Sequence, residues 1–146
     1  MSEREAGRRA RTLTAVRRRW MGFLGIGAAL ALVGVVPDVV LTDDDALVFF
    51  AVLLGMIPAV YFGFALNDQR ARIIGAETLG ALVYGGVAVL AITAKEPTLL
   101  GVGYIAHALW DAIHPHGLDT KMPWWYVPMC IGFDIPVGIY VLVRFA

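Results

Sequence analysis

Apolar residues follow one another in five long stretches, and short polar segments separate them. Each stretch is roughly long enough to cross about 30 Å of hydrocarbon at about 1.5 Å per residue, although the first and fourth are near the lower limit. The apolar residues are continuous and do not alternate, which indicates membrane helices and not barrel strands. We therefore predict an all-α integral membrane protein, a compact bundle of five transmembrane helices: residues 20–36, 46–66, 73–94, 98–114 and 124–143.

Residues with helix-capping or helix-ending chemistry stand at two of these boundaries. Thr42, in the segment TDDDA, can cap the second helix, and the acidic residues after it favour a helix start. Pro115 disfavours helical geometry at the residue before it. We therefore predict that the fourth helix ends at His114 and that His116 lies in the following loop.

The composition agrees with a membrane protein and narrows its chemistry. Hydrophobic residues make up 59% of the chain and charged residues 16%, far from the balance of a soluble domain. Because 146 residues leave room for one bundle, any site must be built from the helices and their short connections. The single cysteine, Cys130, excludes an internal disulfide and a thiolate metal cluster within one chain. The sequence contains no phosphate-binding glycine loop, so we expect no nucleotide cofactor. We expect no nucleic-acid partner for the arginines of the amino-terminal region, because the chain is so apolar.

Basic residues are distributed unevenly between the two sides of the predicted membrane. Residues 1–19 form a basic arm that contains seven arginines, and residues 20–146 form the bundle. Five crossings place ten basic residues on the side of the amino terminus and two, Lys95 and Arg144, on the other side. Because basic residues collect in cytoplasmic loops, we predict a cytoplasmic amino terminus, an external carboxyl terminus and a multi-pass protein of the cell's inner (plasma) membrane.

Two interpretations of the amino-terminal region remain open at this stage. The arm can form a helix along the membrane surface, with Leu13, Val16 and Trp20 as its apolar edge, or it can be a disordered tail. A cleaved signal peptide is a weaker interpretation of the first apolar stretch. That stretch is longer than the usual core of a signal peptide, and four more apolar stretches follow it.

Ionisable side chains occur inside several of the apolar stretches. In the segment YIAHALWDAIHPHG, the spacing of His107, Asp111 and His114 places them within an arc of about 60° on one helix face. Glu77 and Asp134 belong to the third and fifth stretches, in the half of the bilayer predicted to be cytoplasmic or near its middle. Burying an ionised carboxylate at this depth without a partner costs on the order of several kcal/mol. Each of these carboxylates therefore needs a group that neutralises it. No lysine or arginine lies within the stretches.

Imidazoles and carboxylates on converging helices suit a divalent cation. We predict His107, Asp111, His114 and His116 as its ligands, and zinc, iron or manganese as the metal. Asp134 and Glu77 are the candidate catalytic residues, either accepting a proton or completing the ligand set.

Two other interpretations of these residues are retained. In one, His107 forms a hydrogen bond with Asp134 or a tyrosine inside the bundle, and Asp111 forms a cap or a pair near the interface. His114 and His116 are then solvated loop residues. In the other, the ionisable groups form a proton relay or an ion path.

The collection of histidines and an aspartate at one leaflet resembles membrane metal hydrolases of the alkaline ceramidase type. The present chain is shorter and lacks their full set of histidines, so no residue role is transferred from that group. The leading hypothesis is a metal-dependent membrane enzyme, a hydrolase or an oxidoreductase, acting on a lipid-like or isoprenoid-like substrate that enters from the bilayer. The alternatives are a non-catalytic accessory or assembly subunit of a larger membrane complex, a homo-oligomer, and a proton-coupled carrier.

Overall fold

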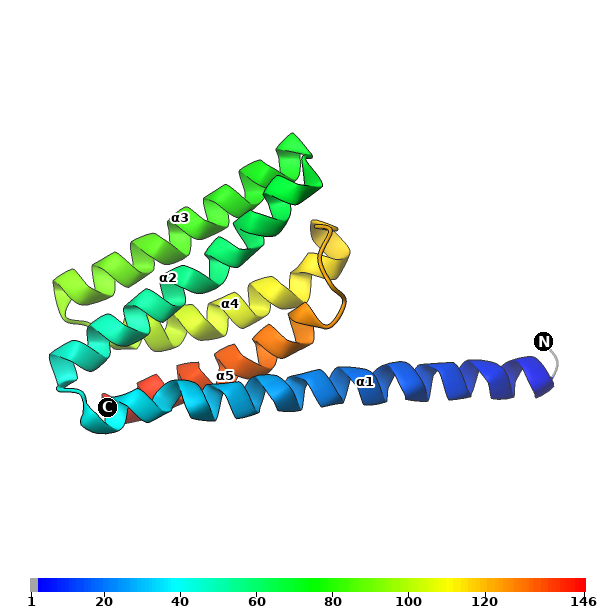
Figure 1. Ribbon diagram of the computed structural model, residues 1–146, viewed down its shortest axis with the longest axis horizontal. Helices are drawn as coiled ribbons and strands as arrows, with labels where there is room; N and C mark the ends of the chain where they lie inside the picture. The colour runs from blue at the N-terminus through cyan, green and yellow to red at the C-terminus, as the bar shows by residue number, and fades with distance from the viewer. Residues whose placement is uncertain (1–2) are drawn as a thin grey trace.

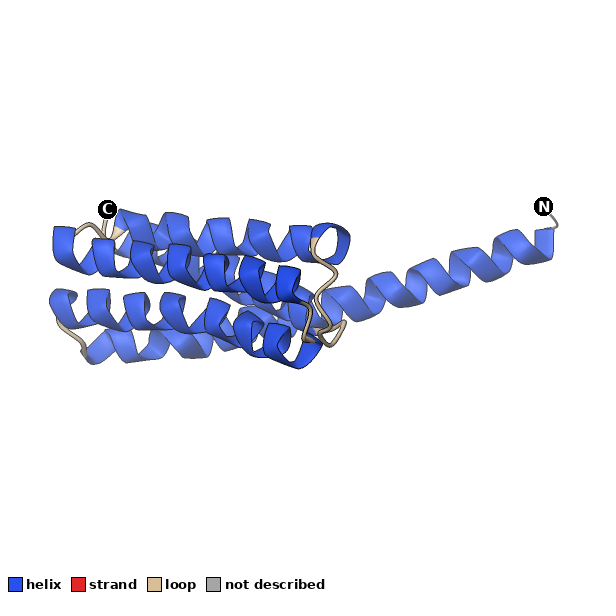
Figure 2. Ribbon diagram, turned by 90° about the horizontal axis from the view of Figure 1, so that it is seen from above, coloured by secondary structure: helices blue, strands red, loops and turns tan. Residues whose placement is uncertain are grey.

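The computed structural model describes residues 3–146, except for the side chains of residues 3, 4, 6–11, 115 and 116. Five α-helices and one short 3-10 helix make up this part of the chain (Figure 1). Their bounds are α1 Glu3–Val35, η1 Val36–Val40, α2 Asp43–Asp68, α3 Ala71–Ala94, α4 Thr98–Gly117 and α5 Tyr126–Arg144. The described residues contain no strand, so the all-helical prediction is confirmed for them (Figure 2).

The helices have the length and surface of membrane-spanning segments. Four stretches are long and apolar enough to cross a bilayer: Thr12–Val40, Asp43–Asp68, Ala71–Ala94 and Tyr126–Arg144. Large apolar side chains such as Val33, Leu82 and Val143 are more than half exposed on the outside of the bundle, which suits contact with lipid. The fourth helix, α4, is not among these stretches, so the prediction of five membrane spans is not confirmed.

The bundle consists of a helical hairpin and a three-helix layer. The turn at Gln69 and Arg70 joins α2 to α3, with Gln69 in the left-handed conformation. In the other layer α5 packs against both α1 and α4, and it lies between them in Figure 1. The layers meet where α3 and α2 contact α4. Because α5 lies between α1 and α4, its side chains contact both of these helices.

Glycines allow α5 to approach both neighbours closely. A Cβ atom added at Gly132 would lie 2.2 Å from the carbonyl oxygen of Leu24 in α1, and one added at Gly27 would lie 2.0 Å from that of Met129. On the α4 side, a Cβ atom at Gly138 would lie 2.9 Å from the Gly101 carbonyl oxygen. Small residues commonly allow this backbone-to-backbone packing in membrane helices.

The end of the bundle opposite the amino terminus is closed by a polar network around Asp38 of η1. Its Oδ2 atom accepts hydrogen bonds from the Tyr140 hydroxyl at 2.5 Å and from the Arg144 Nε atom at 3.0 Å. Arg144 also donates to Asp43 at 2.7 Å. These contacts connect η1 and the start of α2 to the last turn of α5.

The observed helix ends confirm one boundary prediction and correct another. The Thr42 hydroxyl accepts a hydrogen bond from the Asp45 amide, as expected for a cap of α2. The arm and the first apolar stretch form one continuous helix from Glu3. The prediction that α4 ends at His114 is wrong: α4 continues to Gly117, and the amides of Leu118 and Asp119 then donate to the His114 carbonyl. A proline removes one backbone donor, and one more turn can still form after it.

Candidate metal centre

Three of the predicted site residues meet between α4 and α5. The Nδ1 atom of His107 shares a hydrogen bond of 2.8 Å with the Oδ2 atom of Asp134, as the simpler interpretation predicted, and it lies 3.6 Å from the Oδ1 atom of Asp111. One ligand-type atom from each of the three residues lies within 4.8 Å of the other two. His107 and Asp111 are one helical turn apart on α4, and Asp134 faces them from the middle of α5. We refer to His107, Asp111 and Asp134 as the centre.

The centre is sealed from solvent, and several of its polar atoms have no hydrogen-bond partner. The side chains of all three residues have an exposed fraction of 0%. Six buried side-chain atoms in the described part of the chain have no hydrogen-bond partner, and four of them belong to the centre: His107 Nε2, both carboxylate oxygens of Asp111, and Asp134 Oδ1. The other two are Asp38 Oδ1 and the hydroxyl oxygen of Tyr61. Buried polar atoms normally have partners. Converging oxygens without donors are the environment in which a cation is stabilised.

The charges of the centre also favour a cation. Two ionised carboxylates carry a charge of −2, and no lysine or arginine occurs in the sequence between residues 96 and 120 or between 122 and 143. A divalent cation would neutralise the centre with His107 uncharged. Two extra protons would do the same, one on the imidazole and one on a carboxylate. Because uncompensated charge at this depth is costly, the centre holds either the cation or those protons.

Aromatic rings surround His107 on the sides that the carboxylates leave free. The Tyr84 ring lies edge-to-face at 4.9 Å from the imidazole centroid, and the Tyr61 ring lies at 5.8 Å. Both carboxylates approach the Nδ1 atom, so a cation shared by the three residues would bind at Nδ1 in place of its hydrogen bond with Asp134. The packing fixes the ring plane, and a fixed plane limits the positions that an ion can occupy.

Glu77 and His114 form a second group that is separate from the centre. The His114 Nε2 atom lies 2.7 Å from the Glu77 Oε1 atom, and the Thr120 hydroxyl donates to the same oxygen at 2.8 Å. The structure therefore does not bring His114 to the predicted site with His107, nor does it place Glu77 there. His114 is buried and is not the solvated residue of the simpler interpretation. The side chain of His116 lies outside the described residues.

Hydrogen bonding defines the proton content of the Glu77–His114 pair. The His114 Nδ1 atom lies 3.1 Å from the carbonyl oxygen of Trp110, which can only accept, so Nδ1 carries a hydrogen. The contact between Nε2 and Glu77 requires one further hydrogen between the two atoms. The pair is therefore neutral as a whole, whichever residue holds that proton. It can remain buried without a cation.

A salt bridge holds the loop that supplies Thr120. Arg70 donates from Nε and Nη2 to the two carboxylate oxygens of Asp68, at 2.6 and 2.7 Å. The Nη2 atom also donates to the Asp119 carbonyl, and the Lys121 amide donates to Asp68 at 2.9 Å. These bonds connect the α2–α3 turn to the α4–α5 loop. We refer to Asp68, Arg70 and the backbone of residues 119 and 121 as the clasp.

An apolar groove on the outside of the bundle lies beside the centre. It has a volume of about 400 Å³ and lies between α1 and α2, with α5 as its floor. Val33, Met56 and Val60 line its exposed walls, and Phe133 and Asp134 line its floor. Asp134 is therefore both a member of the centre and a wall of this α1–α2 groove.

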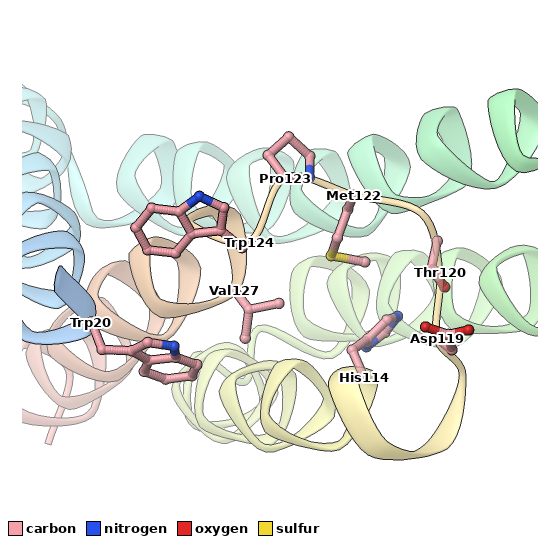
Figure 3. A pocket seen from close by; sticks show the side chains of 8 residues that line it. All are labelled: Trp20, His114, Asp119, Thr120, Met122, Pro123, Trp124 and Val127. Carbon is pink, nitrogen blue, oxygen red and sulfur yellow. The ribbon is translucent and has the colours of Figure 1, made fainter. Parts of the chain in front are cut away.

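A second cavity lies beside the α4–α5 loop, at the end of the bundle from which α1 projects (Figure 1). It has a volume of about 270 Å³. Figure 3 shows His114, Asp119 and Thr120 on one side and Trp20 and Trp124 on the other. We refer to this cavity as the loop pocket. Trp124, which lies just before α5, packs edge-to-face on Phe23 of α1 at 5.2 Å and forms part of the wall of the loop pocket.

Sequence reasoning missed two residues of this region. Thr120 lies in the α4–α5 loop, whose sequence has no periodic pattern from which its position could be predicted. The one feature of the sequence that pointed to Thr120 was its place shortly after the histidines. Tyr61 lies against both His107 and His114, and its only signal was its helical spacing from Asp68.

Family models, curated proteins and solved structures were compared with the chain, and none of them matches.

Proposed function

We propose that the protein is a five-span membrane enzyme that binds one divalent cation at the centre and hydrolyses a lipid-like or isoprenoid-like substrate. The surface of α4 supports its assignment as the fifth span. Val102, Leu109 and Ile113 are more than half exposed on its outer face, whereas His107 and Asp111 face inward. Its 20 residues correspond to about 30 Å, close to the thickness of the hydrocarbon core.

The set of donors favours a hydrolytic metal over an oxidative one. The centre offers one imidazole and two carboxylates, because His114 belongs to the other group. Non-haem iron oxygenases typically use two histidines and one carboxylate, whereas oxygen-rich sites suit manganese and can also bind zinc. We therefore expect zinc or manganese at His107, Asp111 and Asp134.

The position of Asp134 is the observation that carries the proposal. Asp134 belongs to the buried centre, and it is also among the residues that line the α1–α2 groove, although its side chain has an exposed fraction of 0%. The other lining residues of the groove are almost all apolar, and its walls are continuous with the surface that would face the acyl chains. A substrate with an apolar chain can therefore lie in the groove beside the centre, and a small displacement of the side chains over Asp134 would let its polar group reach the cation without crossing water.

A bound cation would polarise the scissile group and make a water molecule more acidic. The contribution of the chain is to place and hold charge. His107 is fixed by its aromatic neighbours, and Asp134 presents one oxygen toward His107. Asp111 has two oxygens without hydrogen-bond donors among the described residues, so one can bind a cation while the other accepts a proton.

The experiment measures metal content and hydrolysis in the same purified variants. Protein prepared without metal affinity chromatography is equilibrated with zinc or manganese and analysed for bound metal. We expect about one ion per chain in the wild type, as for a single well-formed site. His107→Ala and Asp111→Asn should weaken binding by more than about 100-fold, beyond the loss typical of outer-shell changes. Asp38→Asn, which alters a buried carboxylate at the other end of the bundle, should bind normally.

Hydrolysis is then tested in nanodiscs with fluorescent acyl esters, acyl amides and prenyl phosphates. We expect cleavage of at least one of these compounds, dependent on the cation and absent in Asp111→Asn. Val60→Trp, which narrows the α1–α2 groove, should slow cleavage without changing metal content. A wild-type protein that binds no stoichiometric zinc or manganese would overturn the proposal, and so would a metal-loaded protein that cleaves none of the three classes.

A further inference from the structure

The centre has no direct opening to water, so a cation must pass through the protein to reach it. All three side chains are fully buried. Two cavities lead toward them from different directions, the α1–α2 groove and the loop pocket. The inference below rests on the proposed function, because it concerns how the same centre obtains its ion.

The α1–α2 groove is a poor route for a cation. Apart from Asp134, which lies at its inner end, its walls offer apolar side chains such as Val33, Met56 and Val60. A divalent cation that enters it from the bilayer would lose its water before it met any oxygen or nitrogen ligand. The cost of burying an uncompensated charge makes this entry unfavourable.

The loop pocket has the side chains and the position that the groove lacks. His114, Asp119 and Thr120 line it, and all three carry atoms that can bind a cation. The Asp119 side chain is 89% exposed, so this wall is reached by water. The basic arm emerges from the same end of the bundle (Figure 1). In Figure 3 His114 lies next to Asp119, on the side of the pocket opposite Trp20.

The Glu77–His114 pair stands between the loop pocket and the centre. His114 lines the pocket, contacts Glu77 at 2.7 Å, and lies against the ring of Tyr61 at 4.5 Å. The same Tyr61 ring lies against His107 on its other side. A single aromatic side chain therefore bridges the two groups. Glu77 and His114 also provide an oxygen and a nitrogen donor partway along the route.

We propose that Glu77 and His114 form a transit site through which the divalent cation passes from the loop pocket to the centre. In the resting state the two residues neutralise each other and need no ion. A cation in the pocket competes with the shared proton for the His114 Nε2 atom and the Glu77 carboxylate, and that proton leaves through the pocket. Movement of the Tyr61 ring then opens the way to Asp111 and His107. The clasp keeps Thr120 beside Glu77 and so holds the outer wall of the route.

The rate of metal loading tests this proposal. Full-length protein in detergent is stripped with a chelator and mixed with Co²⁺, and the absorbance of the bound ion is followed over time. The variant His114→Phe retains an aromatic ring between Tyr61 and Trp110 but removes both nitrogens. We expect the metal to load at least about tenfold more slowly than in the wild type. This factor is the lower end of the range typical of substitutions at residues that support the metal ligands. The final content should remain that of the wild type.

Glu77→Gln is the second variant, because it keeps a group that can hydrogen-bond with Thr120 and removes the charge. If the elution volume and helical content of His114→Phe show that it does not fold, Glu77→Gln alone tests the transit site. We again expect slow loading with an unchanged final content. Val60→Trp and Asp38→Asn should load at the wild-type rate, because neither changes the loop pocket.

Three results would overturn the transit site while leaving the centre in place. The first is wild-type loading rates in both His114→Phe and Glu77→Gln. The second is complete loss of equilibrium binding in these variants, which would make the pair part of the resident site. The third is slow loading in Val60→Trp, which would place the route in the groove. Failure of the wild type to bind Co²⁺ at all would instead count against the proposed function.

Discussion

At the scale of single residues, glycines determine how closely α5 packs against its neighbours. At Gly132 the helix backbone faces the Leu24 carbonyl of α1, and at Gly138 it faces Gly101 of α4. No side chain can be inserted at these points without moving a backbone. Asp134 lies between the two glycines in the sequence, so the packing that they allow also determines its distance from His107.

Gly132→Ala should destabilise the bundle. The added Cβ atom would lie 2.2 Å from a backbone oxygen, so α1 and α5 must separate. We expect a loss of about 1–3 kcal/mol in the free energy of unfolding, the usual cost of overpacking a core. The matched control is Gly55→Ala, where a Cβ atom meets nothing within 4 Å. Thermal unfolding in detergent, followed by helical circular dichroism, compares them, and equal midpoints for the two variants would contradict this account.

Residue spacing predicted part of the site and misplaced part of it. His107, Asp111 and His114 share one helix face, and from this the sequence predicted a common ligand set. Residues that share a helix face have similar angular positions about the helix axis, but they can lie at different heights along it. Residues 107 and 114 are separated by about 10 Å along the axis, too far for one ion. The partners Asp134 and Glu77 come from other helices, and one sequence could not show which histidine each would meet.

At the scale of elements, the clasp links two connections that are far apart in the chain. It joins the α2–α3 turn to the α4–α5 loop through Asp68 and Arg70. The hydrogen bond to Asp68 holds the pKa of Arg70 above its ordinary value. A raised pKa of a basic group contributes stability below its unfolded pKa, and this contribution is lost only as the pH rises through the folded value. The clasp is therefore insensitive to pH across the neutral range.

Asp68→Asn should loosen the α4–α5 loop. An asparagine side chain has one oxygen instead of two and no charge, so it cannot accept both bonds from Arg70. We expect the amides of residues 118–122 to exchange with deuterium about tenfold faster, as local opening becomes easier. The control is Asp44→Asn, which removes an exposed pair with Lys95 at the other end of the bundle. Unchanged exchange in Asp68→Asn would show that the loop is held by other contacts.

Helix positions could be predicted well and helix ends less well. The five predicted stretches correspond to α1 to α5, because continuous apolar sequence is a strong signal. The end of α4 was misjudged because the rule at Pro115 considers only local sterics. The turn after it is completed by the amides of Leu118 and Asp119, which lie beyond the proline.

At the scale of the whole molecule, the number of crossings determines which surfaces face which compartment. Four stretches meet the length and composition of spans, and α4 is proposed as the fifth. With five crossings, the loop pocket and the basic arm share one side of the membrane. The Asp38 network then lies on the other side.

Labelling of single cysteines tests this arrangement. In a Cys130→Ala background, Arg18→Cys and Asp119→Cys should be on one side of the membrane, and Lys95→Cys and Asp44→Cys on the other. The side chains of Asp119, Lys95 and Asp44 are exposed, so a membrane-impermeant maleimide can reach a cysteine at each of these positions from the appropriate side. Five crossings require opposite accessibility for residues 95 and 119. Labelling of both from the same side would show that α4 does not cross.

The central position of α5 has a consequence for biogenesis. This helix is the last of the five to leave the ribosome, yet it lies between the first and the fourth and supplies Asp134. A nascent chain with four inserted helices would thus expose the glycine-facing surfaces of α1 and α4 and hold only two of the three residues of the centre. The proposed cation site would therefore be completed only when α5 has packed between helices that are already in the membrane.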